Sequence, residues 1–324
     1  MDESLLILLA AFGLDLLLGD PVYPLHPVRV IGGLINVVEA GLERCGFRTL
    51  FGGIVLLASV PAAALGAYGA GLLLAGPFAV MLNLYLCYSF LAVKDLHRHG
   101  KAVLAALEGN NLPEARSAVQ KMIGRKAQCL DRFGVARATV ESLAENFIDG
   151  FLAPLFWYCA GTAWAKAFAV SPASGGIAAL TVYKAVNTLD SMVGYRNERY
   201  EQFGKASARM DDLLNFIPAR LGIPILTLSA RLCGLDGRNA WNVGWRDRLK
   251  HRSPNAGHAE ACAAGALGVK LNGPGFYPHG KVEKPWLGSG TDRVTTDHLR
   301  KTFRLILCAA VIAVPLFSLP ILCL

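Results

Sequence analysis

Residues 183–215 hold many of the side chains in this chain that could do chemistry. Acidic and basic residues alternate there between two apolar runs, among them Asp190, Arg196, Glu198, Arg199, Lys205, Arg209, Asp211 and Asp212. If the helix expected for the preceding run continues, steps of three and four residues place on one face Asn187, Asp190, Ser191, Gly194 and Glu198. Such a face could hold a divalent cation or a phosphate. The plainer interpretation is a solvated, salt-bridged loop.

A second acidic motif begins at Glu141. Glu145 and Asp149 follow at intervals of four residues, so a helix would present all three carboxylates on one face, with Asn146 beside them. Three like charges on one face repel one another unless a cation or arginines compensate them. The spacing predicts a Mg²⁺ site or a site for a basic substrate. A solvated helix start explains it equally well, because acidic residues also suit a first turn.

Two histidines lie where a base or an anion site could form. His26 and Arg29 lie among three prolines, in a loop that we expect to be rigid. Ser253 and Pro254 resemble an N-cap and the first residue of a helix. Free N–H groups at such a start favour an anion, and the polar residues beside them are Arg252, Asn255 and His258. A lone histidine in such a place is more often a packing or capping residue.

The composition is that of a membrane protein. The 324 residues are 53% hydrophobic and only 17% charged, whereas soluble domains carry more charge. The net charge is +8, but the sequence has no basic stripe with interleaved aromatic residues of the kind that binds nucleic acid. Arginines in cytoplasmic loops, as the positive-inside rule describes, explain this charge better than a nucleic-acid-binding function. Eight scattered cysteines show no CxxC or Cys/His metal spacing. The first apolar run is expected to be an anchor helix rather than a cleaved signal. Asp15 interrupts this run and is a candidate functional residue, because a charge buried in the membrane is costly.

The apolar runs predict an all-α polytopic membrane protein with a single membrane domain. They cover residues 5–18, 51–74, 77–93, 151–170, 177–193, 213–235 and 305–324. The sixth run holds two prolines and two arginines, which favours a broken or re-entrant segment and leaves about six transmembrane helices. Two long polar regions, 94–140 with nine Lys or Arg and 237–301 with eleven, are expected on the cytoplasmic side. Small residues in the second region would let a helix pack closely on a neighbour: Gly257, Ala261 and Gly265.

Four motifs, taken together and in order, carry a family resemblance: LDLLLGDPVYPLHPVRVIG, ESLAENFIDGFLAPLFW, YKAVNTLDSMVGYRNERYEQFGKASARMDDLLNFIPARL and HRSPNAGHAEACAAGALGV. The chain resembles the CbiB/CobD family of adenosylcobinamide-phosphate synthases over nearly its whole length. The resemblance implies a multi-pass protein of the cell inner membrane with a cytoplasmic active site. It also implies a ligase that joins (R)-1-aminopropan-2-ol phosphate, or ethanolamine phosphate, to adenosylcobyric acid through an amide bond at the expense of ATP.

The implied chemistry gives the charged residues roles. A carboxylate reacts with an amine only after its oxygen becomes a leaving group, and phosphoryl transfer from ATP would make an acyl phosphate, which needs Mg²⁺ and cationic clamps. The predicted catalytic residues are His26, His258, Asp190 and Lys205. Either histidine could act as the base. The predicted substrate and phosphate ligands are Arg29, Asn187, Arg196, Asn197, Arg199, Arg209, Arg252 and Asn255. The predicted Mg²⁺ ligands are Glu141, Glu145, Asp149 and Asp211.

Two other functions stay open at this stage. A membrane-embedded, Mg²⁺-dependent prenyl or phosphoalcohol transferase would also use aspartate clusters, although no DDxxD run is present. A transporter would explain Asp15 and Asp190 within apolar runs, although no internal repeat is present. No GxxxxGK[ST] motif occurs, so ATP would need an unconventional site. The expected partners are the corrinoid and aminoalcohol phosphate substrates, membrane lipid and other cobalamin-assembly enzymes, and no nucleic acid.

Overall fold

A computed structural model describes residues 2–20, 23–124, 126–195, 197–277 and 280–323. The chain divides into two compact units, each built from separate segments. Unit 1 comprises Met1–Ala92, Ala153–Leu214 and Val314–Leu324, and unit 2 comprises Val93–Leu152 and Asn215–Ala313. Both units consist mainly of helices, which confirms the all-α class predicted from the apolar runs.

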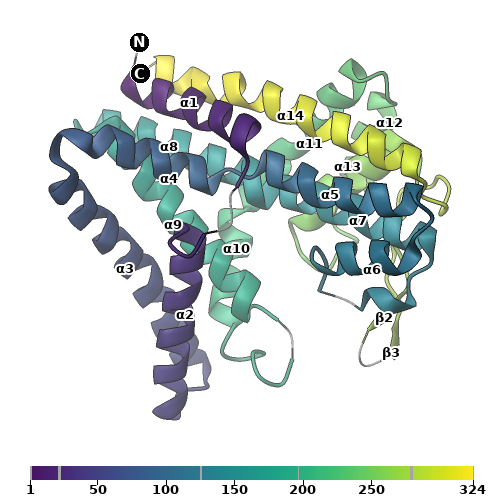
Figure 1. Ribbon diagram of the computed structural model, residues 1–324, viewed down its shortest axis with the longest axis horizontal. Helices are drawn as coiled ribbons and strands as arrows, with labels where there is room; N and C mark the ends of the chain where they lie inside the picture. The colour runs from purple at the N-terminus through teal and green to yellow at the C-terminus, as the bar shows by residue number, and fades with distance from the viewer. Residues whose placement is uncertain (1, 21–22, 125, 196, 278–279, 324) are drawn as a thin grey trace. The chain divides into compact units, whose positions relative to one another are not determined.

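Unit 1 is a group of helices packed around α9. Its elements are α1 (Glu3–Leu18), α2 (Pro27–Arg44), α3 (Leu50–Ala75), the 3₁₀ turn η1 (Gly76–Phe78), α4 (Ala79–Phe90), α8 (Ala153–Ala167), α9 (Pro172–Val193), α10 (Lys205–Leu214) and the end of α14 (Thr296–Cys323). α9 contacts α1, α2, α3, α4, α8 and α10, and α2 lies beside α3 (Figure 1). Large side chains on α9 are fully buried, including Ile177, Leu180 and Leu189, so burial of apolar area holds the group together.

The ends of α1, α8 and α14 meet at one lysine in unit 1. Lys166 Nζ lies 2.6 Å from Asp2 Oδ2. The same ammonium donates to the backbone carbonyl of Ile321 in the last turns of α14. Asp2 also caps α1 by accepting a hydrogen bond from the N–H of Ser4. One side chain therefore joins three elements that are far apart in the sequence.

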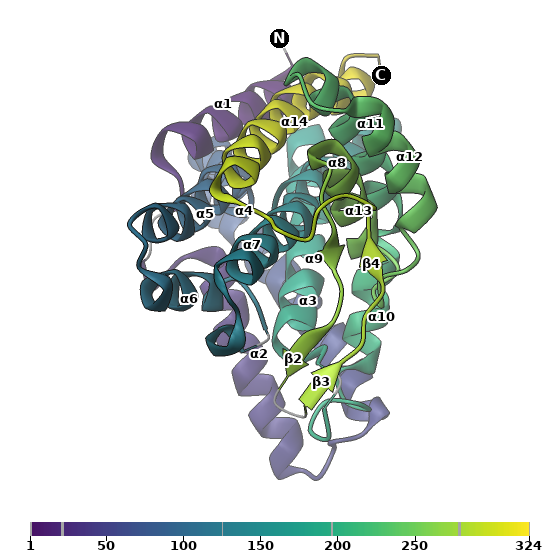
Figure 2. The same cartoon turned by 90° about the vertical axis from the view of Figure 1, so that its right-hand side faces the viewer.

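Unit 2 contains the remaining helices and two short pairs of strands. Its helical elements are α5 (Val93–Glu108), α6 (Leu112–Gln120), η2 (Ala127–Cys129), α7 (Arg132–Phe147), the π-helical turn η3 (Ile148–Leu152), α11 (Phe216–Leu232), α12 (Gly237–Asp247), α13 (Ala256–Leu267) and the start of α14. The strands are β1 (Leu271–Asn272), β2 (Gly275–Tyr277), β3 (Gly280–Val282) and β4 (Trp286–Leu287), with β1 antiparallel to β4 and β2 to β3 (Figure 2). The sequence interpretation did not predict these strands.

Helix α13 forms the centre of unit 2, and all its residues are buried. A Cβ atom on Gly265 would lie 2.4 Å from the backbone oxygen of Asn239, and one on Gly257 would lie 2.3 Å from that of Arg248. The predicted close packing of small residues is therefore confirmed, against α12 and the turn that follows it. The helix begins at Ala256 rather than at Pro254, and the Ser253 hydroxyl accepts a hydrogen bond from the N–H of Ala256 at 3.2 Å.

Among the residues that the structure describes, two stretches are long and apolar enough to cross a bilayer: Leu50–Glu108, which includes α3 and α4, and Thr296–Leu319 within α14. Helices α10 and α11, separated by a break at Asn215, meet the same test as a broken span or re-entrant loop. This agrees with the broken segment expected at residues 213–235. Six crossings stay a prediction, because α1 and α8 have only 16 and 15 residues.

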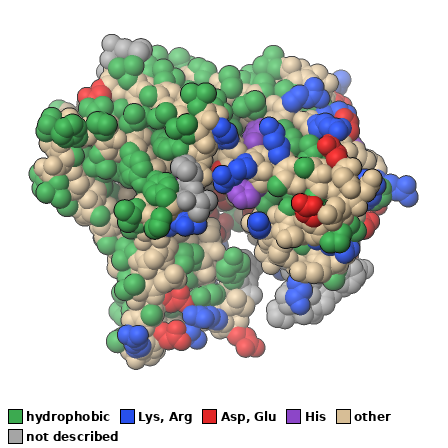
Figure 3. Space-filling view, viewed as in Figure 1, with side chains coloured by type: hydrophobic (Ala, Val, Ile, Leu, Met, Phe, Trp, Pro, Cys, Tyr) green, Lys and Arg blue, Asp and Glu red, His purple; other side chains and the backbone are tan. Residues whose placement is uncertain are grey.

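Apolar and charged side chains separate clearly on the surface of unit 1. Figure 3 shows apolar side chains over α1, α3 and α4, and acidic and basic side chains at the end formed by α2 and the loop before α10. The exposed apolar residues include Leu17, Leu73 and Leu74, which are 74%, 87% and 90% exposed. Exposed apolar area on this scale fits a lipid-facing surface.

Candidate functional site

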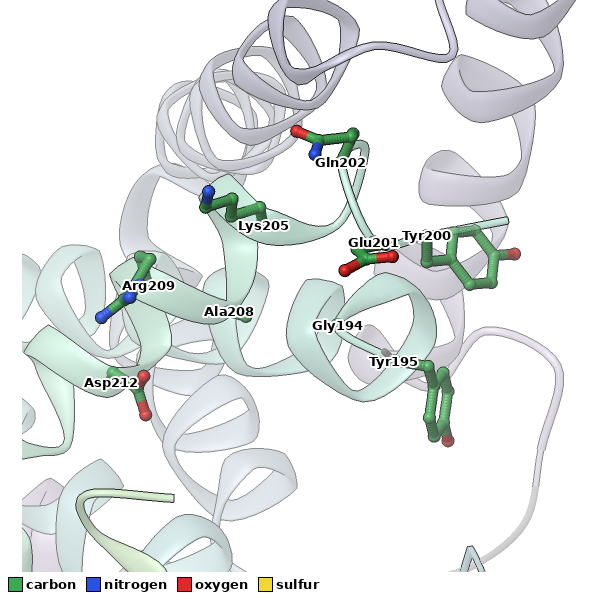
Figure 4. Close-up of a pocket in the computed structure, with 9 residues that line it drawn as sticks. All are labelled: Gly194, Tyr195, Tyr200, Glu201, Gln202, Lys205, Ala208, Arg209 and Asp212. Atoms are coloured by element: carbon green, nitrogen blue, oxygen red, sulfur yellow. The ribbon is translucent and has the colours of Figure 1, made fainter. Parts of the chain in front are cut away.

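A polar pocket opens where α9 ends and α10 begins. It has a volume of 310 Å³ and is lined by Gly194, Tyr195, Tyr200, Glu201, Gln202, Lys205, Ala208, Arg209 and Asp212 (Figure 4). Lys205 and Arg209 lie one turn apart on α10, so their cationic groups point along the same side of the helix. Two of the predicted site residues therefore come together here, with Asp212 beside them.

Two glycines shape this pocket. Helix α9 ends at Val193, and the N–H of Gly194 donates to the carbonyl of Asp190 at 2.8 Å. A Cβ atom on Gly194 would lie 1.9 Å from Asp190 Oδ1, and one on Gly204 would lie 1.7 Å from the carbonyl oxygen of Val193. Only glycine allows the chain to turn this closely between the two helices. Because α9 stops there, Glu198 lies outside the helix and does not share the predicted face with Asp190 and Asn187.

A hydrogen bond ties α9 to α10 behind the pocket. Asn187 Nδ2 donates to Asp211 Oδ1 at 3.2 Å, and Asp211 is buried. These two predicted site residues are thus neighbours, although they are 24 positions apart in the sequence. The contact fixes the orientation of α10, which carries Lys205 and Arg209.

Arg199 pairs with acidic residues on α2. Its guanidinium donates to Glu39 Oε1 at 3.0 Å and lies 3.6 Å from Glu43 Oε2, and the hydrogen bond to Glu39 is the main cause that raises the pKa of Arg199. The Tyr200 hydroxyl donates to the same oxygen of Glu39 at 3.0 Å. Asn197 accepts a hydrogen bond from the Tyr200 N–H within the loop. The predicted ligand Arg196 lies outside the described residues.

In unit 2, His258 is fully buried on α13. Its Nδ1 atom lies 3.2 Å from the carbonyl oxygen of Asn255, so Nδ1 carries the proton in the neutral ring and Nε2 keeps its lone pair. Among the described residues Nε2 has no hydrogen-bond partner. Burial, and then the nearby charges of Arg220 and Arg248, lower the pKa of His258 to about 4. The ring is therefore a neutral hydrogen-bond acceptor at pH 7.

The sequence interpretation did not assign a role to Arg220 or Arg248. Arg220 stacks on the Phe216 ring at 3.4 Å and donates to its carbonyl oxygen, and Arg248 lies 4.9 Å from the centre of the Trp245 ring. The sequence did contain a signal for Arg220, because an arginine within an apolar run such as residues 213–235 is unusual and often functional. The predicted ligand Arg252 is exposed, and Asn255 is buried at the start of α13.

The predicted acidic face is altered by the π-helical turn. Glu141 and Glu145 lie on α7, whereas Asp149 lies in η3, where the helical period changes. Glu141 Oε1 accepts a hydrogen bond from the N–H of Asn272 at 2.7 Å and lies 3.9 Å from Arg137 Nε, so it helps to hold β1 against α7.

The described residues contain no group of three or more His, Cys, Asp or Glu side chains placed to hold a metal ion. Glu141, Glu145 and Asp149 belong to unit 2 and Asp211 to unit 1. The Mg²⁺ site therefore stays a prediction.

The predicted base His26 lies in unit 1 and precedes α2 as its N-cap residue. Its Nε2 atom is 2.8 Å from Asp20 Oδ1, and its ring packs edge-on against Tyr23. Because α2 begins at Pro27, Arg29 lies on a helix rather than in the expected rigid loop, and it is exposed. His26 thus has the Asp20 carboxylate as an ion-pair partner, whereas the Nε2 atom of His258 has no hydrogen-bond partner among the described residues.

The chain matches a family of known proteins over almost its full length. The family described as CobD/Cbib protein matches residues 8–306. The cobalamin biosynthesis protein CobD of Geobacter metallireducens is 44% identical over 309 residues, which cover 94% of this chain and 93% of that protein. CobD of Desulfotalea psychrophila is 40% identical over 98% of this chain and 97% of its own length. CbiB of Salmonella choleraesuis is 40% identical over 95% and 94%.

No solved structure matches this chain significantly. The family match covers the pocket at α10, the acidic residues of α7 and the start of α13. Each of the three relatives covers more than nine tenths of both chains. The chain therefore belongs to the CobD/CbiB protein family.

Proposed function

We propose that this cobalamin biosynthesis enzyme is an adenosylcobinamide-phosphate synthase. It joins adenosylcobyric acid to an aminoalcohol phosphate, (R)-1-aminopropan-2-ol phosphate or ethanolamine phosphate. The structural observation that supports this best is the polar pocket at α10, where Lys205 and Arg209 meet at the rim of a 310 Å³ cavity. The family match over residues 8–306 favours this function over a prenyl transferase or a transporter.

In this proposal the pocket holds the phosphate of the aminoalcohol. The Lys205 ammonium and the Arg209 guanidinium donate charge-assisted hydrogen bonds to the phosphate oxygens, and the fork of arginine suits two of them at once. Asp212 lines the same pocket, and its negative charge offsets the repulsion between the two cations when no anion is bound.

The reaction needs an activated carboxyl group and a free amine. Phosphoryl transfer from ATP to the corrinoid propionate forms an acyl phosphate and ADP. The amine attacks the acyl carbon, the amide C–N bond forms, and inorganic phosphate leaves. The ammonium of the aminoalcohol must first lose a proton to a base, because only the free amine has a lone pair that can attack.

ATP and Mg²⁺ enter the proposal through the family resemblance and the chemistry of carboxylate activation. Mg²⁺ typically takes one or two protein carboxylates and completes its shell with water and phosphate oxygens. Such a shell does not require the group of three acidic side chains that the described residues lack. We place the enzyme in the inner membrane as a multi-pass protein with its site on the cytoplasmic side, because both basic polar regions then obey the positive-inside rule.

The direct test is synthesis of the amide by the purified full-length protein. Adenosylcobyric acid, aminopropanol phosphate, ATP and Mg²⁺ are incubated with it, and the product is identified by mass spectrometry. We expect adenosylcobinamide phosphate, and equal yields of ADP and amide. Omitting ATP or Mg²⁺ should stop the reaction. Product formation without ATP would exclude the acyl phosphate route, and no product with any aminoalcohol phosphate would exclude the function.

A further inference from the structure

Helices α11 and α12 form a shallow groove in unit 2 that the proposed chemistry does not use. Its volume is 340 Å³, and its lining residues are Pro224, Thr227, Leu228, Arg231, Arg238 and Trp241. Most of this lining is apolar, yet it holds two arginines. A soluble pocket for a small anion would not need so much apolar surface, so the groove suits a ligand with both a charged and an apolar part.

The two arginines are exposed and available for a ligand. Neither Arg231 nor Arg238 has an ion-pair or hydrogen-bond partner among the described side chains. A Cβ atom on Gly237 would lie 2.3 Å from the Cγ atom of Arg231. The stem of Arg231 therefore passes closely under the first turn of α12, which restricts the side chain and keeps its guanidinium at the groove.

The groove lies at the level where a candidate membrane span changes from charged to apolar. In α14 the last charged residue before the apolar run is Arg304, and Leu305 follows it. Ser229 on α11 donates to the carbonyl oxygen of Leu305 at 2.6 Å, and Cys233 donates to that of Arg304 at 3.5 Å. Because α14 is a candidate span, this level is that of the membrane–water interface, and Arg231 lies between the two donors in the sequence.

Apolar side chains beside the arginines are exposed on the same elements. Leu228 is 46% exposed, Leu232 is 66% exposed and Trp241 is 44% exposed. The Trp241 ring packs against Trp245 with ring centres 5.7 Å apart, so α12 presents an aromatic pair. Tryptophan is enriched at membrane interfaces, where its ring sits at the level of the lipid headgroups.

We propose that this groove binds an anionic phospholipid. Arg231 and Arg238 contact the phosphate of the headgroup, Trp241 lies at the glycerol level, and Leu228 and Leu232 face the first part of the acyl chains. A soluble phosphate would satisfy the two guanidinium groups but would leave the apolar side chains in water. The lipid satisfies both parts of the groove.

The test measures lipid binding by the full-length protein and its variants in detergent. Native mass spectrometry counts bound phosphatidylglycerol and phosphatidylcholine with identical acyl chains. We expect phosphatidylglycerol to be preferred, and each of Arg231→Gln and Arg238→Gln to weaken its binding about fivefold, or about 25-fold together. The matched control is Arg132→Gln, which removes an exposed arginine of the same unit far from the groove in the sequence.

Three outcomes of the binding measurements would overturn the proposal, and a fourth comes from competition with a soluble phosphate. They are equal binding of the two lipids, unchanged phosphatidylglycerol binding in the double variant, or an equal loss in the Arg132→Gln control. Displacement of the lipid by millimolar glycerol phosphate would also contradict it, since the groove would then be a site for a soluble phosphate. Melting temperatures show whether each variant is folded. If the double variant is not folded, the two single variants are compared with the parent protein instead.

Discussion

At the scale of single residues, the structure separates cations that are paired from cations that face a pocket. Arg199 is occupied by Glu39 and Glu43, while Lys205 and Arg209 line the cavity at α10. The sequence placed all three in one charged stretch and could not distinguish them. Pairing depends on α2, which lies about 160 positions from Arg199 in the sequence, and spacing within one stretch carries no information about so distant a partner.

We expect Arg209→Gln to raise KM for the aminoalcohol phosphate. Loss of a charged hydrogen bond costs roughly 1.5–3 kcal/mol, about tenfold to a hundredfold in affinity. Steady-state kinetics with varied aminopropanol phosphate would measure it, and kcat should change less than KM. Arg44→Gln is the control, because that arginine is exposed on α2 outside the pocket. An unchanged KM for Arg209→Gln would show that the phosphate of the substrate does not bind in this pocket.

The buried His258 makes stability depend on pH in a defined direction. The pKa of the ring is about 4 in the folded protein, against 6.5 for an ordinary histidine. As pH falls below 6.5 the unfolded chain binds a proton that the folded chain excludes, so the free energy of unfolding decreases until pH reaches about 4. The full difference is about 3 kcal/mol.

His258→Gln should therefore flatten this dependence. The pKa of His251 is also lowered to about 4 by burial, so the variant should keep part of the decrease. Denaturant unfolding at pH 7 and pH 5 gives the slope for each protein. His251→Gln is the matched variant, and the two losses should be similar. A variant at position 258 with the slope of the parent protein would show that His258 is protonated in the folded state.

At the scale of helices and strands, the apolar runs predicted the elements well and their ends poorly. Two prolines and two arginines predicted a broken or re-entrant segment over residues 213–235, but all four lie within the continuous helix α11, and the break precedes them at Asn215. The apolar run 177–193 ends where α9 ends, at Val193, whereas the start of α13 at Ala256 was not predicted. That start lies beside the close contact of Gly257 with the backbone of Arg248, which neither propensity nor periodicity contains.

The close packing of α13 on α12 can be tested with a single methyl group. In Gly265→Ala the new Cβ atom would meet the backbone of Asn239 at 2.4 Å. Backbone cannot move aside easily, so we expect a loss of about 1–3 kcal/mol in the free energy of unfolding. Gly33→Ala on α2 is the control, since no atom lies within 4 Å of its Cβ position. It should be neutral or stabilising, by up to about 1 kcal/mol. Equal effects would contradict the packing.

At the scale of the whole molecule, family membership followed from motifs spread over the chain, whereas the grouping into two units did not. Each unit combines segments from distant parts of the sequence. The hydrogen bond between Asn187 and Asp211, like the grouping of α5 to α7 with α11 to α13 in one unit, depends on packing between segments that are distant in the sequence. The single membrane domain and the six crossings therefore stay predictions.

The crossing count can be tested by labelling from each side of the membrane. Lys121→Cys and Asp292→Cys place exposed thiols in the two basic polar regions, after the exposed Cys45 and Cys129 are replaced by serine. We expect a membrane-impermeant maleimide to label both from the cytoplasmic side only, because both regions are basic. Opposite sides would mean that residues 213–235 cross the membrane completely and that the count is seven.

The contact of Lys166 with Asp2 and with Ile321 also sets an order of events while the ribosome makes the protein. Asp2 is already synthesised when Lys166 emerges, but Ile321 follows 155 residues later. At about 5–20 residues per second, translation of that interval takes roughly 8–30 s. During this time all residues of α10 to α13 emerge, and the carbonyl partner in α14 arrives last. Unit 1 therefore closes only after unit 2 has been translated, and insertion of its early helices must persist through that delay.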